Sequence, residues 1–256
     1  MEESSTETGK AGQDDLALVL SFAARGQTAG EGDDEGDAAG RLIAAGDLAE
    51  FTAVALGRLA GAGRKEVLRR ALGFAVPLPG ETVERSFVIL FSALEAALTF
   101  SRGEDEFEIV PREEFTRMER DLKNWLRQHP ALAGEPARRA LVYEKTRELN
   151  RLPFSRVFER FCERHGVELS DLWPLTGPLD EWPLLEIRHR LVHGDPLESR
   201  PAAALLCARE HLRWTAERML LALLGWPVEK SNVSPPRLAA VSEAHRRWPE
   251  ERARLA

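Results

Sequence analysis

Apolar residues recur along this chain at intervals of three and four positions, and no segment alternates apolar and polar residues over several positions. That spacing places apolar side chains on one face of an α-helix and predicts an all-α fold. The predicted helices are separated by segments rich in Gly and Pro. They cover roughly residues 14–25, 38–45, 48–60, 64–73, 83–102, 111–128, 135–152, 153–165, 183–193, 201–225 and 236–247.

Composition divides the chain into four segments. Residues 1–13 are polar and acidic, so we expect them to be disordered, with Asp14 and Asp15 capping the first helix. Residues 14–75 form an N-terminal helical region. Its segment GQTAGEGDDEGD at 26–37 is interpreted as a solvated linker, because the spacing does not fit a calcium loop. A Pro-rich boundary at 76–82 precedes a larger helical domain at 81–226, and residues 227–256 are expected to be a short C-terminal tail.

One predicted helix is apolar around most of its circumference. It contains the sequence FVILFSALEAALTF at 87–100, and we expect it to be a central core helix. Glu95 lies inside this apolar run, where an unpaired buried carboxylate is unfavourable. Two interpretations remain open: Glu95 faces solvent at the edge of the helix, or it contacts an arginine from another helix.

The net charge of −7 describes mainly the start of the chain. Residues 1–50 contain twelve acidic and three basic residues, whereas the remainder contains 30 acidic and 32 basic residues. The acidic balance therefore does not exclude a nucleic-acid partner, but the strongly basic stripe typical of such proteins is missing. We expect any RNA ligand to bind a local pocket, and we interpret the arginine-rich stretch 135–152 as a solvent-facing helix surface.

Cysteine usage and the start of the chain favour a cytoplasmic protein. Cys162 and Cys207 lack metal-ligand spacing and sit among apolar residues, which indicates small buried side chains in a reducing compartment. The N-terminus does not resemble a signal peptide. No apolar stretch is long enough to cross a bilayer, so we expect no membrane contact.

The sequence RHRLVHG at 188–194 carries the candidate chemistry. Arg188 can hold a phosphate group, and His193 can move a proton near neutral pH. The spacing alone is not specific, since the chain contains a second arginine five positions before a histidine, Arg160 and His165. There the intervening residues look like a core stripe, and His165 is interpreted as an ordinary residue at a helix C-terminus.

Helix geometry sets a condition on this motif. Five positions on an ideal helix separate two side chains by about 140° around the axis. Arg188 and His193 can therefore share a pocket in two ways. Either the helix frays at His193, which Gly194 and Pro196 favour, or a second copy of the chain supplies the other half of the pocket.

The motif resembles the signature of HEPN ribonucleases, in which an arginine is followed by a polar residue and, after three further positions, by a histidine. The strings LLEIRHRLVHGDPL, FSALEAALTF and ALLCAREHLRWTAERML together resemble the Apea-like HEPN branch over roughly residues 83–226. His189 stands where many members have Asn. The resemblance implies a HEPN-like helical bundle, here with extra N-terminal helices and a C-terminal tail. It also implies a homodimer with a shared active-site cleft.

The same resemblance implies metal-independent endonucleolytic cleavage of RNA, often by a toxin or an antiviral defence effector. We hypothesise that His193 acts as general base or general acid, that Arg188 holds the phosphate, and that His189 orients it. Glu95 would keep Arg188 in place. The 2′-hydroxyl of RNA is the nucleophile, so no metal or cofactor is expected. An antitoxin or regulatory protein is a further expected partner.

Alternatives remain open at this point. Arg188 and His193 could be a surface pair neutralised by Glu186 or Asp195. The chain could be a non-catalytic HEPN-like module that binds a protein or nucleic acid, or a helical scaffold. No zinc pattern, nucleotide-binding fingerprint or activated Ser or Cys is recognisable. His211 is interpreted as a helix-surface residue, and the six tryptophans as packing residues.

Overall fold

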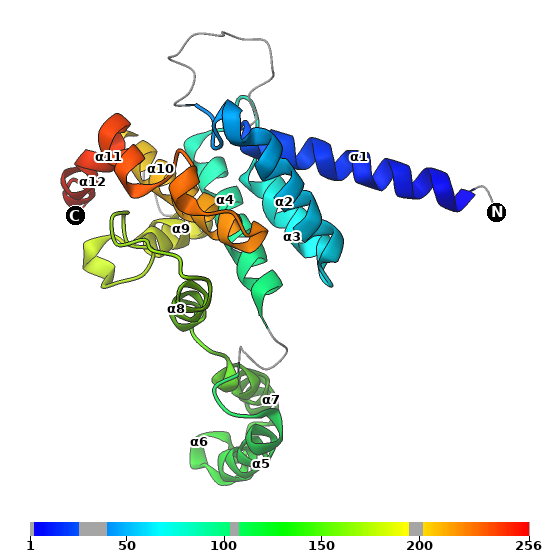
Figure 1. Cartoon of the computed structure of the whole chain (residues 1–256). Coiled ribbons are helices and arrows are strands. Elements are labelled where there is room, and N and C mark those ends of the chain that lie inside the picture. The colour runs from blue at the N-terminus through cyan, green and yellow to red at the C-terminus, as the bar shows by residue number, and fades with distance from the viewer. Residues whose placement is uncertain (1–2, 26–39, 103–107, 195–201, 256) are drawn as a thin grey trace. The chain divides into compact units, whose positions relative to one another are not determined.

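The computed structural model describes residues 3–25, 40–102, 108–194 and 202–255, with the backbone alone for residues 3–11 (Figure 1). Over these residues the secondary structure is helical, apart from turns and two isolated β-bridges, so the predicted all-α fold is confirmed. The chain divides into two compact units. Unit 1 comprises Met1–Phe100 and Cys162–Ala256, and unit 2 comprises Ser101–Phe161.

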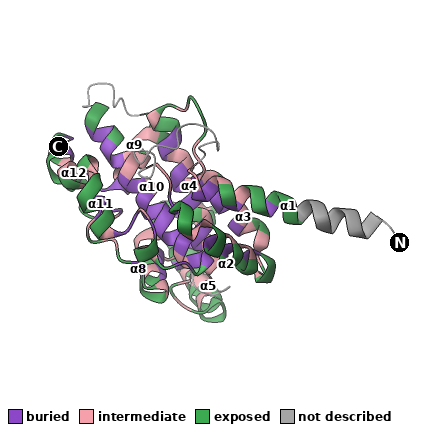
Figure 2. Cartoon of the chain, turned by 45° about the horizontal axis from the view of Figure 1, so that its top comes forward, coloured by how far each residue is buried: buried purple, intermediate pink, exposed green. Residues whose placement is uncertain are grey.

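Unit 1 is organised around α10 (Ala202–Leu224), a long helix that is buried along most of its length. It packs against α2 (Leu48–Gly61), α3 (Lys65–Ala75) and α12 (Glu243–Ala253). The expected core helix is α4 (Val83–Ser101), which buries Phe87, Phe91 and Leu94. Figure 2 shows the buried residues gathered on α10 and α4. The remaining helices of unit 1 are α1 (Glu3–Ala23), the end of α8 (Phe154–His165), α9 (Leu184–His193) and α11 (Pro235–Val241).

The structure divides the chain differently from the division expected from composition. The N-terminal helices belong to the same unit as α9 and α10, because α2 and α3 pack directly on α10. Residues 227–256, expected to be a tail, also belong to this unit, and Leu255 near the end of the chain is fully buried. Within residues 81–226, expected to be one domain, the structure has unit 2 inserted between the two parts of unit 1.

The N-terminal helix begins earlier than predicted. The structure places residues 3–13 in α1, where disorder was expected. Asp15 is not a capping residue but a buried side chain within α1, where it forms ion pairs with Lys65 and Arg69 of α3. The helix predicted at 38–45 is also wrong over residues 40–44, which contain turns and a bridge. The solvated linker predicted at 26–37 lies outside the described residues.

Unit 2 is a small helical insertion. It contains α5 (Arg112–Gln128), α6 (Pro130–Ala133), α7 (Pro136–Thr146), the 3-10 helix Arg147–Asn150 and most of α8. The side chain of Asn150 forms two hydrogen bonds with the backbone of Val110, which connects the end of the insertion to its beginning. Tyr143 donates a hydrogen bond to the carbonyl of Lys123 and links α7 to α5.

Candidate functional site

The motif RHRLVHG lies in α9, and both ends of this helix are fixed by local structure. Its first two amides, those of Leu184 and Leu185, donate hydrogen bonds to the carbonyls of Pro174 and Leu175. These bonds satisfy donors that the first turn of a helix leaves unpaired. Leu184 and Ile187 are fully buried. The start of α9 is therefore held against unit 1, and the motif lies on its remaining turns.

The helix ends at Gly194. This residue adopts φ of 75°, the left-handed conformation that favours glycine, and its amide donates to the carbonyl of Arg190. The helical conformation continues through His193. Fraying of the helix at His193, one of the two ways in which the motif residues could meet, is thus not observed. Pro196 lies outside the described residues.

Arg188 lies beside Glu95 of α4. One guanidinium nitrogen, Nη2, is 3.5 Å from the Glu95 carboxylate oxygen Oε1. The side chains of Arg188 and Glu95 are 30% and 52% exposed, so Glu95 both faces solvent and contacts the arginine. An exposed ion pair of this length contributes only about 0–1 kcal/mol. Arg188 is therefore held in place and is still available to exchange the carboxylate for another anion.

His189 and His193 share one face of α9. They are four positions apart, both are exposed, and their ring centroids are 4.3 Å apart. Arg188 projects from a different part of the helix circumference, about 140° away from His193 on regular helical geometry. One copy of the chain thus brings together Arg188 with Glu95, and His189 with His193, but it does not bring Arg188 and His193 into one pocket.

Arg190, the second arginine of the motif, has partners of its own. The guanidinium of Arg190 lies over the ring of Trp182 at 4.3 Å, and its Nε donates to Glu186 at 2.8 Å. Glu186 is therefore the partner of Arg190, not of Arg188 as the surface-pair interpretation proposed. The other acid in that interpretation, Asp195, lies outside the described residues.

A buried polar cluster supports the connection that precedes α9. Arg218 of α10, which is fully buried, forms hydrogen bonds through both terminal nitrogens with Asp171. Its Nε donates to the carbonyl of Val233, and Nη1 also donates to that of Glu168. His245 of α12 contacts the same carboxylate at 2.9 Å. Burial raises the pKa of Asp171, but hydrogen bonds from Arg218 and His245 outweigh burial and leave the pKa below its usual value.

His211 is a core residue rather than the surface residue expected from the sequence. Its side chain is fully buried on α10. Nδ1 accepts a hydrogen bond from the backbone amide of Trp173, and Nε2 lies 3.1 Å from the carbonyl of Ala244. Burial lowers the pKa of His211 to about 4, so the ring is neutral, with its proton on Nε2. Its neighbours Arg209, Glu210 and Arg213 are charged, so the local sequence carries no signal of this burial.

This cluster reaches α9 through Trp173. The indole Nε1 of Trp173 donates to the carbonyl of Trp182, and Trp182 contacts Arg190 in turn. On the other side, Arg252 of α12 lies 3.5 Å from Glu181. The residues that orient the start of α9 are thus held by α10 and α12, two helices that follow it in the sequence.

Other candidate chemistry is limited in the described parts of the chain. Cys162 and Cys207 are free thiols. Burial and the nearby carboxylates of Glu251 and Glu210 raise the pKa of Cys207 to about 12, which disfavours a nucleophilic thiolate. Across the four described ranges, no three His, Cys, Asp or Glu side chains are grouped so that they could hold a metal ion. None of the described helices is sufficiently long and apolar to span a bilayer.

No protein-family model matches this chain, and no curated protein or solved structure is significantly similar to it. The resemblance to HEPN ribonucleases therefore stays a prediction based on residues 188–194 and on the helices before and after them.

Proposed function

We propose that this protein is a metal-independent endoribonuclease whose active site forms between the α9 helices of two copies of the chain. The observation that carries the proposal is the last turn of α9. It presents two exposed imidazoles, His189 and His193, with ring centroids 4.3 Å apart, on the same helix as Arg188, whose partner among the described residues is the exposed carboxylate of Glu95. A proton-transfer group and a phosphate-binding group are both accessible there.

A second copy supplies what one helix cannot. Because Arg188 and His193 diverge on a helix that stays regular through His193, the arginine of one copy has to complement the histidine of the other. A two-fold arrangement gives two equivalent pairings, each of which brings His189 and His193 of one copy to Arg188 of the other. A homodimer is therefore part of the proposal.

The reaction balances without an added cofactor. The 2′-oxygen of the ribose attacks phosphorus while the bond from phosphorus to the 5′-oxygen breaks. One imidazole accepts the proton of the 2′-hydroxyl, and a second, protonated imidazole donates a proton to the departing 5′-oxygen. Arg188 stabilises the additional negative charge on the non-bridging oxygens. The products are a 2′,3′-cyclic phosphate and a 5′-hydroxyl end, and DNA, which lacks the 2′-hydroxyl, is not cut.

The test is cleavage of a labelled RNA in excess EDTA, with analysis of the product ends. We expect cleavage to persist in EDTA and to be lost in Arg188→Ala and in His193→Ala, with a cyclic phosphate at the new 3′ end. Cleavage that requires magnesium, or that is unchanged in both variants, would show that this site is not the catalytic one.

A non-catalytic module is the second candidate, and one observation favours it: Arg188 and His193 do not share a pocket in one copy of the chain. In that case the chain binds RNA or a protein without cutting RNA. Replacing Arg188 then weakens binding, while no cleavage product appears from any variant. A cellular role as a toxin or an antiviral defence effector follows from the resemblance alone and is part of the nuclease proposal.

A further inference from the structure

One tryptophan differs from the others. Trp173, Trp182, Trp214 and Trp226 are buried, as expected for packing residues. Trp125 of α5, in unit 2, is 59% exposed. Its ring lies next to that of His129, with centroids 5.1 Å apart. His129 is itself fixed, since its Nδ1 accepts a hydrogen bond from the amide of Ala131 at the start of α6. Trp125 is therefore an exposed ring with one hydrogen-bonded imidazole beside it.

The rest of α5 separates its side chains into distinct faces. The inward face carries Phe115, Glu119, Leu122, Lys123 and Leu126, all partly buried. Glu119 is neutralised there by Lys123, at 2.7 Å, and accepts a hydrogen bond from Thr146. An exposed edge on one side carries Met118 and Trp125, two turns apart.

The opposite exposed edge is a row of arginines. Arg117, Arg120 and Arg127 recur at intervals of three and seven positions, which places them along one side of the helix. All three are exposed, and none forms an ion pair with a described carboxylate. Exposed arginines elsewhere in the described chain, such as Arg58, Arg70 and Arg237, also lack such a partner, so the row on α5 is distinguished by its spacing along one helix edge and by the exposed Trp125 on the same helix. Guanidinium groups in a row repel one another, and the surrounding water or a bound anionic ligand reduces this repulsion.

We propose that this surface of α5, consisting of Arg117, Arg120, Arg127 and Trp125, binds single-stranded RNA. Guanidinium groups in a row match successive phosphates, and an exposed indole is a stacking platform for an unpaired base. An acidic protein would satisfy the arginines but would leave Trp125 without an aromatic partner. Single-stranded RNA satisfies both features, and its choice as ligand rests on the function proposed above.

Three acidic side chains on the exposed side of α5 oppose this ligand, Glu113, Glu114 and Asp121, and Asp121 provides a test of sign. Asp121 lies between the arginine edge and Trp125 on the helix circumference, and it is exposed. Its carboxylate repels a phosphate chain that crosses from one edge to the other. Asp121→Asn is therefore expected to strengthen RNA binding, whereas a surface that does not bind RNA is unaffected by this change.

The experiment measures binding by fluorescence anisotropy, with a labelled 20-nucleotide single-stranded RNA in EDTA. It uses the full chain carrying His193→Ala, so that RNA is not consumed. Replacing Arg117, Arg120 and Arg127 by Gln should weaken binding at least tenfold. It should also make the slope of log K against log salt concentration less steep by about 2, since each phosphate contact contributes about 0.7 to that slope on a single strand. Trp125→Ala should weaken binding about tenfold, with partial rescue by Trp125→Phe.

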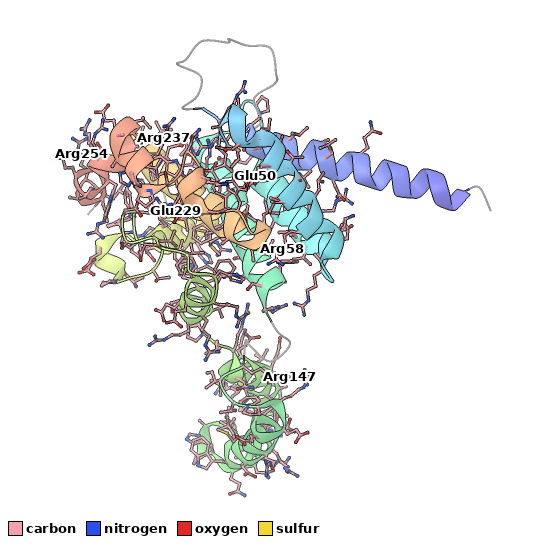
Figure 3. The ribbon with its side chains drawn as sticks, in the orientation of Figure 1. Glu50, Arg58, Arg147, Glu229, Arg237 and Arg254 are labelled. Carbon is pink, nitrogen blue, oxygen red and sulfur yellow. The ribbon has the colours of Figure 1, made fainter. Side chains whose placement is uncertain are left out.

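A matched control variant tests whether RNA recognises this surface of α5 or only the total positive charge of the protein. Arg58, Arg70 and Arg237 of unit 1 are exposed and likewise form no ion pair with a described carboxylate. Figure 3 labels Arg58 and Arg237. Their triple replacement by Gln removes the same charge and should change the affinity less than threefold. Equal losses in the two triple variants, or unchanged affinity in both the α5 triple variant and Trp125→Ala, would overturn the proposal.

The outcome is distinguishable from failure of the nuclease proposal. If the protein does not cleave RNA but binds it through α5, only the function proposed for α9 fails. If the protein cleaves RNA and the α5 variants bind as tightly as the parent, only the inference about α5 fails. Circular dichroism and thermal unfolding of each variant verify that these exposed substitutions leave the fold intact.

Discussion

Arg218 and Asp171 form a doubly hydrogen-bonded ion pair inside unit 1, with Nη1 on Oδ1 and Nη2 on Oδ2. Arg218 is fully buried, so its charge depends on this carboxylate and on the carbonyls of Val233 and Glu168. His245 binds the same carboxylate from α12. One side chain, Asp171, thus joins the connection before α9 to both α10 and α12.

Removing Asp171 should strongly destabilise the protein. Asp171→Ala leaves a buried guanidinium without its counter-ion, and loss of one partner of such a pair lowers the free energy of unfolding by about 3–5 kcal/mol. The matched control is Glu95→Ala, which removes a carboxylate from the exposed pair with Arg188 and should lower it by less than about 1 kcal/mol. Urea unfolding followed by circular dichroism measures both values. Similar losses in the two variants would contradict the role given to the buried pair.

Acid should destabilise the protein in two steps. The pKa of His211 falls from its ordinary 6.5 to about 4 in the folded chain, chiefly because of burial. The unfolded chain therefore binds a proton at higher pH than the folded chain does. Stability should fall as the pH drops from 6.5 to 4, by at most about 3 kcal/mol. The pKa of Asp171 is also lowered, so its contribution is lost at still lower pH, below its ordinary 3.8.

The variant His211→Gln tests the first step. Gln keeps a side chain that can form hydrogen bonds but does not titrate in this range. Unfolding free energies measured between pH 4 and pH 7 should have a clearly smaller slope in the variant. An unchanged slope would mean that another group is responsible.

The sequence is sufficient to predict most helices because helical periodicity is a local property. The cores of α4, α9 and α10 and the end of α9 at Gly194 all follow from nearby residues. It is not sufficient to predict which helix is central. His211 is expected on a helix surface, but α12 covers that side of α10.

The long-range contacts explain the other errors. Residues 243–253 read EAHRRWPEERA, which is typical of a solvated segment, yet His245 reaches Asp171 from 74 positions away. Buried ion pairs of this kind leave no periodic signal in either partner. The separate unit at residues 101–161 is likewise not recognisable from periodicity, because α5 and α7 have the same helical periodicity as the helices of unit 1.

Gly194 should be needed for a regular end of α9. Its φ of 75° is unfavourable for any residue with a Cβ atom, by about 1 kcal/mol or more, although among the described residues no atom apart from the neighbouring backbone lies within 4 Å of the position that a Cβ would occupy. Gly194→Ala should therefore lower stability through backbone conformation alone and reduce RNA cleavage by displacing His193. Gly177→Ala is the control, because that position is equally open and has no positive φ. If both variants behave as the parent protein does, the conformation of Gly194 does not matter for function.

Glu95 should act as a positioning residue for Arg188. Replacing it by Gln removes a carboxylate that competes with phosphate, so RNA should bind more tightly and KM should fall. The guanidinium is then less well oriented, and kcat should fall by a few fold. Steady-state cleavage of a short RNA separates the two effects. A purely structural role would leave both kinetic constants unchanged, since the exposed pair contributes little to stability.

The geometry of α9 makes a strong prediction about mixed dimers. If Arg188 of one copy works with His193 of the other, Arg188→Ala and His193→Ala are each inactive as homodimers. A dimer that contains one copy of each has one intact pairing and one pairing that lacks both groups. Random assembly produces such dimers half of the time, so co-expression should restore about a quarter of the parental activity per dimer. Differently tagged copies allow the mixed dimer to be purified and assayed directly. The control mixes Arg188→Ala with a chain that carries both substitutions, a combination that contains no intact pairing and should stay inactive. If the mixed dimer is also inactive while the parent protein cleaves RNA, Arg188 and His193 act within one chain, and α9 has to open at His193 when RNA binds.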